Sequence, residues 1–348
     1  TAKAAVAVAI VLGVAPLLFV QVIYDPFWYT SNVISAWWLL GFLAVLTVAY
    51  LALYRWYGLN HSYANDGTPS RRPGAPRGGF WLAGSLLLMI VCGAIMHAVV
   101  NQSLQPAEWM NWYAPGGTIV PYGRELHSLT IGRLAFFLLL SLPVTAAWLF
   151  GMRRYLLSSG ETDYGYVDFI EGLAHAMAKA GAVLVLAAGA LWMAALPENM
   201  EWFRTSVWMW IALVPIAYFG AMSFIQKKRK LCIFCNYMAF GMTIIMTIVL
   251  AAVREVLRFV TLLDAVGWNA LDYKITMDWP STAIFFVTFL VLGGLNLSYL
   301  LTLAWKSGQT KDLYTPSSGL TRVGTLAIAS HICWVAGYFI IGWIVING

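Results

Sequence analysis

Long uninterrupted stretches of hydrophobic residues recur along the whole chain, separated by shorter segments that carry most of the charges. A helix rises about 1.5 Å per residue, so about 20 apolar residues cross the roughly 30 Å hydrocarbon core of a bilayer. The stretches that reach this length predict about nine transmembrane helices. They cover residues 4–24, 33–57, 80–100, 129–151, 168–195, 205–225, 232–253, 282–304 and 322–346.

The stretches are continuous and lack the ten-residue alternation of polar and apolar positions that is typical of a membrane barrel. The fold class predicted is therefore all-α, a polytopic transmembrane helix bundle in which residues 1–348 form a single integral membrane domain. The composition agrees, because 61% of the residues are hydrophobic and only 10% are charged. Soluble domains carry about 25% charged residues, so an ordinary soluble domain is excluded.

Orientation is predicted from lysine and arginine, which are enriched in cytoplasmic loops. With the N-terminus in the cytoplasm, the basic residues on the cytoplasmic side are Lys3, Arg55, Arg71, Arg72, Arg77, Arg153, Arg154, Lys227, Lys228, Arg229, Lys230, Lys306, Lys311 and Arg322. Those outside or at the outer rim are Arg124, Arg133, Arg204, Arg254, Arg258 and Lys274. This bias predicts a cytoplasmic N-terminus, a periplasmic C-terminus and a place in the bacterial inner membrane.

Two further expectations follow from the same features. The first stretch has no basic leader before it and no small-residue cleavage site after it, so we expect a retained helix and not a signal peptide. The net charge of +6 is explained by topology and by contact with anionic lipids, so no nucleic acid partner is expected.

Four of the five histidines lie on or beside the predicted helices, where an ionisable group costs about 2.5–3.5 kcal/mol. Their depths sort them into an outer pair, His97 and His127, and an inner pair, His175 and His331. Two imidazoles at one depth on facing helices supply the axial ligands of a haem iron. The pattern predicts two b-type haems, one for each pair. Alternatively, the histidines form hydrogen bonds between helices, and Met96 or Met110 could replace a histidine at the outer haem.

With four histidines on a polytopic helical frame, the chain resembles the di-haem cytochrome b subunits that anchor quinone-linked respiratory complexes. The resemblance implies an electron-transfer subunit of an oxidoreductase, which moves electrons between membrane quinone and a periplasmic or peripheral redox partner. It also implies neighbouring membrane subunits and, as redox partner, a periplasmic c-type cytochrome or an iron–sulfur subunit. The chain departs from many of these subunits because its ligands come from four helices instead of two or three.

The fifth predicted helix carries four polar residues, Asp168, Glu171, His175 and Lys179, at spacings of three, four and four. Such spacing places them along one helical face. Charges on a membrane helix are expected to look into protein or a wet cavity, so we expect a proton relay or a quinone headgroup site near the inner haem. A structural ion pair, or a lysine that extends towards the membrane surface, is also consistent with this pattern.

Cys232 and Cys235, in the string KLCIFCNYM, have the spacing of a redox pair. The string resembles the cysteine motif at a helix entry in quinone-linked disulfide-forming membrane proteins, such as vitamin K epoxide reductase and the disulfide-bond formation protein. This implies a minor alternative function as a thiol oxidoreductase. The predicted topology places the pair in the cytoplasm, where thiols are kept reduced, and no second cysteine pair follows. The hydrophobic pattern is equally consistent with a cofactor-free scaffold subunit and with a solute transporter.

Overall fold

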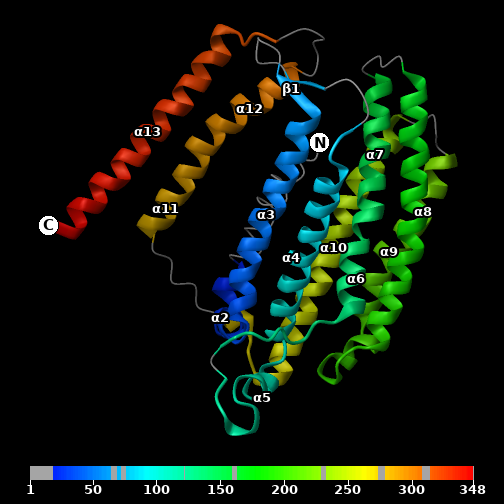
Figure 1. The fold of residues 1–348 in the computed structure, drawn as a ribbon, viewed down its shortest axis with the longest axis vertical. Helices are drawn as coiled ribbons and strands as arrows, with labels where there is room; N and C mark the ends of the chain where they lie inside the picture. The colour runs from blue at the N-terminus through cyan, green and yellow to red at the C-terminus, as the bar shows by residue number, and fades with distance from the viewer. Residues whose placement is uncertain are drawn as a thin grey trace. The chain divides into compact units, whose positions relative to one another are not determined.

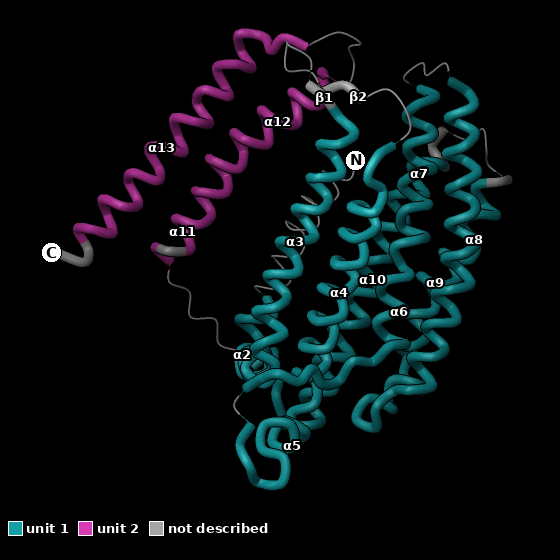
Figure 2. The backbone as a smooth tube through the Cα atoms, in the orientation of Figure 1, with its two compact units in different colours: residues 1–63, 69–273 teal, residues 64–68, 274–348 magenta. Residues whose placement is uncertain are grey.

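The structure, a computed structural model, is almost entirely helical. It describes residues 19–63, 69–71, 76–120, 122–158, 163–228, 233–272, 279–307 and 314–347. The chain divides into two compact units (Figure 2). Unit 1 comprises residues 1–63 and 69–273, and unit 2 comprises residues 64–68 and 274–348.

Unit 1 is a bundle of long helices joined by short helical turns (Figure 1). Its α-helices are α2 (Asp25–Ile34), α3 (Ala36–Asn60), α4 (Gly79–Gln102), α5 (Trp109–Tyr113), α6 (Ile131–Leu139), α7 (Ser141–Ser158), α8 (Tyr164–Ala194), α9 (Val207–Lys228) and α10 (Ile233–Val266). Its 3-10 helices are η1 (Pro106–Glu108), η2 (Pro115–Gly117), η3 (Glu198–Thr205) and η4 (Ala270–Asp272). After α3, β1 (His61–Tyr63) pairs antiparallel with β2 (Pro69–Arg71).

Unit 2 contains two long helical segments. The first runs through α11 (Trp279–Thr288), a π-helical turn η5 (Phe289–Gly293) and α12 (Gly294–Ser307), and the second is α13 (Ser318–Asn347). α12 and α13 pack against each other.

Eight of the described helical stretches are long and apolar enough to cross a membrane. They are Ala36–Asn60, Gly79–Gln102, Ile131–Ser158, Tyr164–Ala194, Val207–Gln226, Asn236–Val266, Thr282–Ser307 and Ser318–Ile344. Each overlaps one of the helices predicted after the first, so the membrane character and these eight helices are confirmed. The predicted helix over 4–24 lies largely outside the described residues. The orientation of the bundle stays a prediction.

α10 is longer than predicted. The hydrophobic stretch predicts an end at residue 253 and an outer loop beyond it, whereas α10 continues to Val266. This prediction is wrong because Arg254 and Arg258 interrupt the hydrophobic stretch without interrupting the helix. Leu257, between them, is buried, so the apolar face continues past the first arginine.

A proline divides the span Ile131–Ser158 into α6 and α7. In a continuous helix the carbonyl of Leu139 would accept a bond from the N–H of residue 143, but Pro143 has none, so α6 ends at Leu139 and α7 continues the span. A Cβ atom on Gly181 of α8 would lie 2.6 Å from the Cδ of Pro143. Glycine is therefore required for the close packing of α7 on α8.

The helices of unit 1 run between two ends of the bundle, and we name each end after one residue that lies there. The Gln102 end, at the bottom of Figure 1, contains the end of α4 and the starts of α6 and α9. The Arg153 end contains the end of α7 and the starts of α8 and α10. Buried hydrophobic side chains form one cluster that includes Tyr24, Phe136 and Leu257, and a smaller one that includes Phe150.

Candidate functional site

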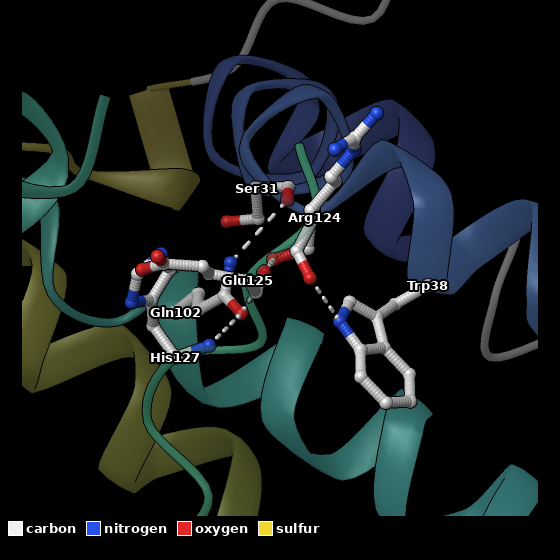
Figure 3. A network of polar contacts seen from close by, with 7 residues as sticks. Ser31, Trp38, Gln102, Arg124, Glu125 and His127 are labelled. Carbon is white, nitrogen blue, oxygen red and sulfur yellow. Dashed lines mark hydrogen bonds and ion pairs between the residues drawn. The ribbon is translucent and has the colours of Figure 1, made fainter. Parts of the chain in front are cut away.

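The side chain of Gln102 anchors an irregular segment that connects the short helices of the Gln102 end to α6 (Figure 3). Its Oε1 accepts hydrogen bonds from the Ser35 hydroxyl at 3.1 Å and from the backbone N–H of His127 at 3.2 Å. Its Nε2 donates to the backbone oxygen of Ser31 at 3.5 Å. Gln102 is fully buried, so these bonds satisfy an amide that would otherwise be costly to bury.

A side-chain hydrogen bond and a close backbone approach hold the same segment on the start of α3. The indole N–H of Trp38 donates to the carbonyl of Arg124 at 2.8 Å, as Figure 3 shows. Gly123 has a φ of +55°, and a Cβ there would lie 2.7 Å from the backbone nitrogen of Ala36. Glycine is needed at this position both for the left-handed backbone and for the close approach.

His127 lies in this irregular segment and not on a helix. Its ring stacks on Trp112, with ring centroids 4.9 Å apart and planes 4° apart. Its Nε2 is 4.0 Å from a carboxylate oxygen of Glu125. Burial lowers the pKa of His127 below its usual value, although the negative charge of Glu125 opposes this shift. The ring is therefore held in place, and its neutral form is favoured over the protonated form.

His97 lies on α4, just over one turn before Gln102. Its Nε2 is buried and has no hydrogen-bond partner among the described residues. Nearby, the side chain of Asn101 donates to Ser128 and Thr130 and accepts a bond from Arg133 of α6. The two histidines of the predicted outer pair thus lie at the same end of unit 1. The structure gives no direct contact between their rings.

Three arginines gather near this end, and among the described residues only one carboxylate pairs with them. Arg133 is buried and lies over the rings of Trp192 at 5.5 Å and Phe137 at 6.0 Å. Arg254 and Arg258, on α10, lie close enough for their charges to repel that of Arg133. The carboxylate is Glu255, which is 2.9 Å from Arg258. The cluster therefore has an excess of positive charge inside the protein.

A cavity of about 410 Å³ lies beside these arginines, between α6, α8, α9 and α10. Its lining residues are Phe136, Phe137, Leu186, Gly189, Ala190, Trp192, Met193, Phe203, Met209, Ala212, Leu213, Ile216, Leu250, Val253, Arg254 and Leu257. All of them are apolar except Arg254. Arg133 lies next to the cavity, because it covers two of the lining rings, Phe137 and Trp192. We call this cavity the arginine pocket.

A second polar cluster lies at the Arg153 end of unit 1. Arg153 of α7 is 2.9 Å from Glu171 of α8, and the other oxygen of Glu171 is 3.9 Å from Nε2 of His175. Nδ1 of His175 is 2.9 Å from the hydroxyl of Ser223 on α9. The ring of Phe150 meets the imidazole edge to face at 4.9 Å. These contacts tie three helices together.

The four polar residues predicted to share one face of α8 separate into two groups. Glu171 and His175 face α7 and α9 and are partly buried, whereas Asp168 and Lys179 are exposed. A step of three residues turns the helix by about 60° in one sense, and a step of four turns it by about 40° in the other, so the four residues spread over a broad arc. The structure therefore brings only Glu171 and His175 together.

His331 belongs to unit 2 and lies on α13. Its Nδ1 is 2.8 Å from the carbonyl of Ala327, and its Nε2 is 3.2 Å from the amide nitrogen of Asn296 on α12. An amide nitrogen can only donate, so Nε2 accepts and Nδ1 carries the proton. Both ring nitrogens are therefore engaged within unit 2.

The predicted cysteine pair falls outside the part of the chain whose side chains the structure describes. Cys232 lies outside the described residues, as does the side chain of Cys235. Cys92 is buried and Cys333 is exposed, and both are free thiols. Among the residues that the structure describes, no group of three or more histidine, cysteine or acidic side chains could hold a metal ion.

Sequence reasoning alone missed the arginine pocket. It assigned Arg133, Arg254 and Arg258 to the outer rim, because charges next to hydrophobic stretches are normally read as topology signals. One signal was present: Arg254 and Arg258 are four residues apart, a spacing that continues a helix.

Comparisons with models of protein families, with curated proteins and with solved structures find no match to this chain.

Proposed function

We propose that this chain is a membrane-embedded electron-transfer subunit that binds a quinone in the arginine pocket. The observation that carries the proposal is a ligand-sized apolar cavity with a single charged lining residue, Arg254. Small-molecule sites are typically cavities of about 300–1,000 Å³ with apolar walls and a few polar groups that orient the ligand.

The chemistry of the pocket suits a quinone. Phe136, Phe137 and Trp192 offer flat surfaces for a quinone ring, and the aliphatic walls suit an isoprenoid tail. A quinone carbonyl needs a hydrogen-bond donor, which the guanidinium of Arg254 supplies. Positive charge from Arg254 and nearby Arg133 also favours the arrival of an electron, since negative charge then develops on the ligand.

The proposal includes a b-type haem between His97 and His127, which would carry electrons to or from the quinone. Two observations support it: both histidines lie at the Gln102 end, and the buried Nε2 of His97 has no partner among the described residues. Such a nitrogen is costly to bury unless it binds a proton donor or a metal. Trp112 and Gln102 would hold His127 in position.

A second haem, between His175 and His331, has less support. These residues belong to different units, and in each unit both ring nitrogens already have polar neighbours. Ligation through Nε2 would require His331 to lose its contact to Asn296 and His175 to lose its contact to Glu171. The periplasmic c-type cytochrome or iron–sulfur partner and the neighbouring subunits likewise stay part of the proposal.

The quinone site can be tested by fluorescence, because Trp192 lines the pocket. We expect a short-chain ubiquinone or menaquinone analogue to quench the tryptophan emission of the purified protein in a saturable manner. Arg254→Met is expected to weaken binding at least tenfold. Arg55→Met, an exposed arginine on α3, serves as the control and should leave the Kd unchanged. Quenching that is linear in both proteins would overturn the quinone proposal.

The haem is tested separately by a reduced-minus-oxidised absorbance spectrum and a pyridine haemochrome assay. We expect a b-type spectrum that His97→Ala removes in part or in full. A protein that is folded and binds quinone but has no haem would leave His97 with a structural role. That outcome would limit the function to quinone binding within a complex.

A further inference from the structure

Lys179 is exposed at the middle of α8. It lies fifteen residues from Tyr164 and fifteen residues from Ala194, the two ends of the helix. At 1.5 Å per residue, each helix end is about 22 Å away. Gly181, two residues further on, packs against Pro143, which lies near the middle of the neighbouring span Ile131–Ser158. Lys179 is therefore near the centre of a membrane span, where a charged side chain is costly unless protein or water surrounds it.

The lysine cannot reach the membrane surface from this position. The hydrocarbon core is about 30 Å thick, so its boundary lies about 15 Å from the centre. The four-carbon stem of a lysine moves its ammonium group by only about 6 Å along the helix. Extension towards the surface therefore does not remove the ammonium group from the apolar layer.

Among the described residues, the chain itself supplies no carboxylate for Lys179. Asp168 and Glu171, the acidic residues closest in sequence, lie eleven and eight residues away, and Glu171 faces Arg153. The hydrophobic stretches over 1–18, 279–307 and 318–347 contain no aspartate or glutamate. We therefore look for an acidic partner at this depth in another molecule.

The exposed face that carries Lys179 is otherwise shaped for a close helix contact. Gly172, Ala176 and Ala180 are exposed at intervals of four residues, so they lie along the same face. A Cβ on Gly172 would meet nothing within 4 Å, so the surface beside it is open. Small residues at this spacing allow the backbones of two membrane helices to approach closely.

We propose that this face of α8 binds a transmembrane helix of a different protein, which places an aspartate or glutamate opposite Lys179. A second copy of this chain does not fit, because parallel copies meeting along α8 would bring two Lys179 side chains together. This surface is separate from the arginine pocket, since the residues of α8 that line the pocket begin only at Leu186.

The test uses the full chain in the membranes of its own host. A photo-reactive amino acid replaces Ala180, and the cross-linked partner peptide is identified by mass spectrometry. We expect the cross-link to join a transmembrane segment of another protein that has an aspartate or glutamate within one helical turn of the linked residue. Lys179→Met should lower the cross-link yield at least tenfold, whereas the control Lys306→Met should not.

Charge exchange then separates pairing from general damage. Lys179→Arg keeps the charge and should keep the cross-link, and Lys179→Glu should recover at least half of the yield when the partner's acidic residue becomes lysine. Three results would overturn the proposal: cross-links only to lipid or to a second copy, a partner segment without an acidic residue, or a yield that Lys179→Met leaves unchanged. Quinone quenching by the same variants shows independently whether the pocket is intact.

Discussion

At the Arg153 end of unit 1, a buried arginine pairs with a glutamate at 2.9 Å, whereas near the Gln102 end three arginines share one glutamate. The first cluster balances its charge with its own side chains and ties three helices together. The second keeps an excess of positive charge beside a cavity of about 410 Å³. A balanced cluster is sufficient to hold helices, but an unbalanced one beside a cavity is suited to a ligand.

This contrast has an energetic basis. Removing one partner of a buried ion pair leaves an uncompensated charge, which typically costs about 3–5 kcal/mol. Removing one charge from a group of like charges relieves repulsion instead. The same kind of mutation should therefore have opposite effects on stability at the two ends.

The largest effect is expected from Glu171→Leu. Arg153 would lose its partner while its side chain is only 10% exposed, so we expect the free energy of unfolding to fall by about 3 kcal/mol. Thermal unfolding of the detergent-solubilised protein measures the change. Asp168→Asn, an exposed site on the same helix, is the control and should change stability by less than about 0.5 kcal/mol. Equal effects of the two mutations would show that Arg153 and Glu171 are not a stabilising pair.

Gly123→Ala should have the next largest effect, about 2 kcal/mol, because the new methyl group meets the backbone of Ala36 and the backbone has a positive φ. Gly116→Ala is a matched control, since Gly116 also has a positive φ but open space around it, and we expect about 1 kcal/mol. Hydrogen exchange should also rise in the segment that holds His127 only in the first variant. Equal losses of stability in the two variants would show that the close approach of Gly123 to Ala36 does not matter for stability.

Arg254→Met should leave the quinone-free protein equally stable or more stable, by up to about 1 kcal/mol, because it removes one of three mutually repelling charges. Arg258→Met should instead lower stability, since Arg258 pairs with Glu255 at 2.9 Å and lies over the ring of Tyr24. Thermal unfolding without added quinone compares the two. A loss of stability in Arg254→Met would mean that this arginine has a structural role.

The smallest effect concerns pH. The folded protein lowers the pKa of His127, chiefly by burial, so the unfolded chain binds the proton more readily. Stability is then expected to fall as the pH falls below about 6.5, the ordinary pKa of histidine, and to level off below the folded pKa. His127→Gln should reduce this pH dependence between about pH 7.5 and about pH 5. An unchanged profile would assign the effect to other groups.

The eight described membrane helices follow from the sequence, because each needs only an apolar stretch of sufficient length. The extension of α10 does not, since Arg254 and Arg258 look like loop charges until Trp192 and the pocket are placed beside them. Spacing along α8 suggested one polar face, but which of its residues is buried depends on the packing of α7 and α9. Ser223 and Gln102 could not be selected in advance, because their partners come from distant parts of the chain.

The π-helical turn in unit 2 contains one residue more than an α-helical turn would, so every position after it is rotated by about 100°. Asn296, three residues after the end of this turn, meets His331. The pairing of α12 with α13 therefore depends on the number of residues in the π-helical turn as well as on the side chains. A related protein that lacks one residue between 289 and 293 would keep both the asparagine and the histidine and still turn the asparagine away from its partner.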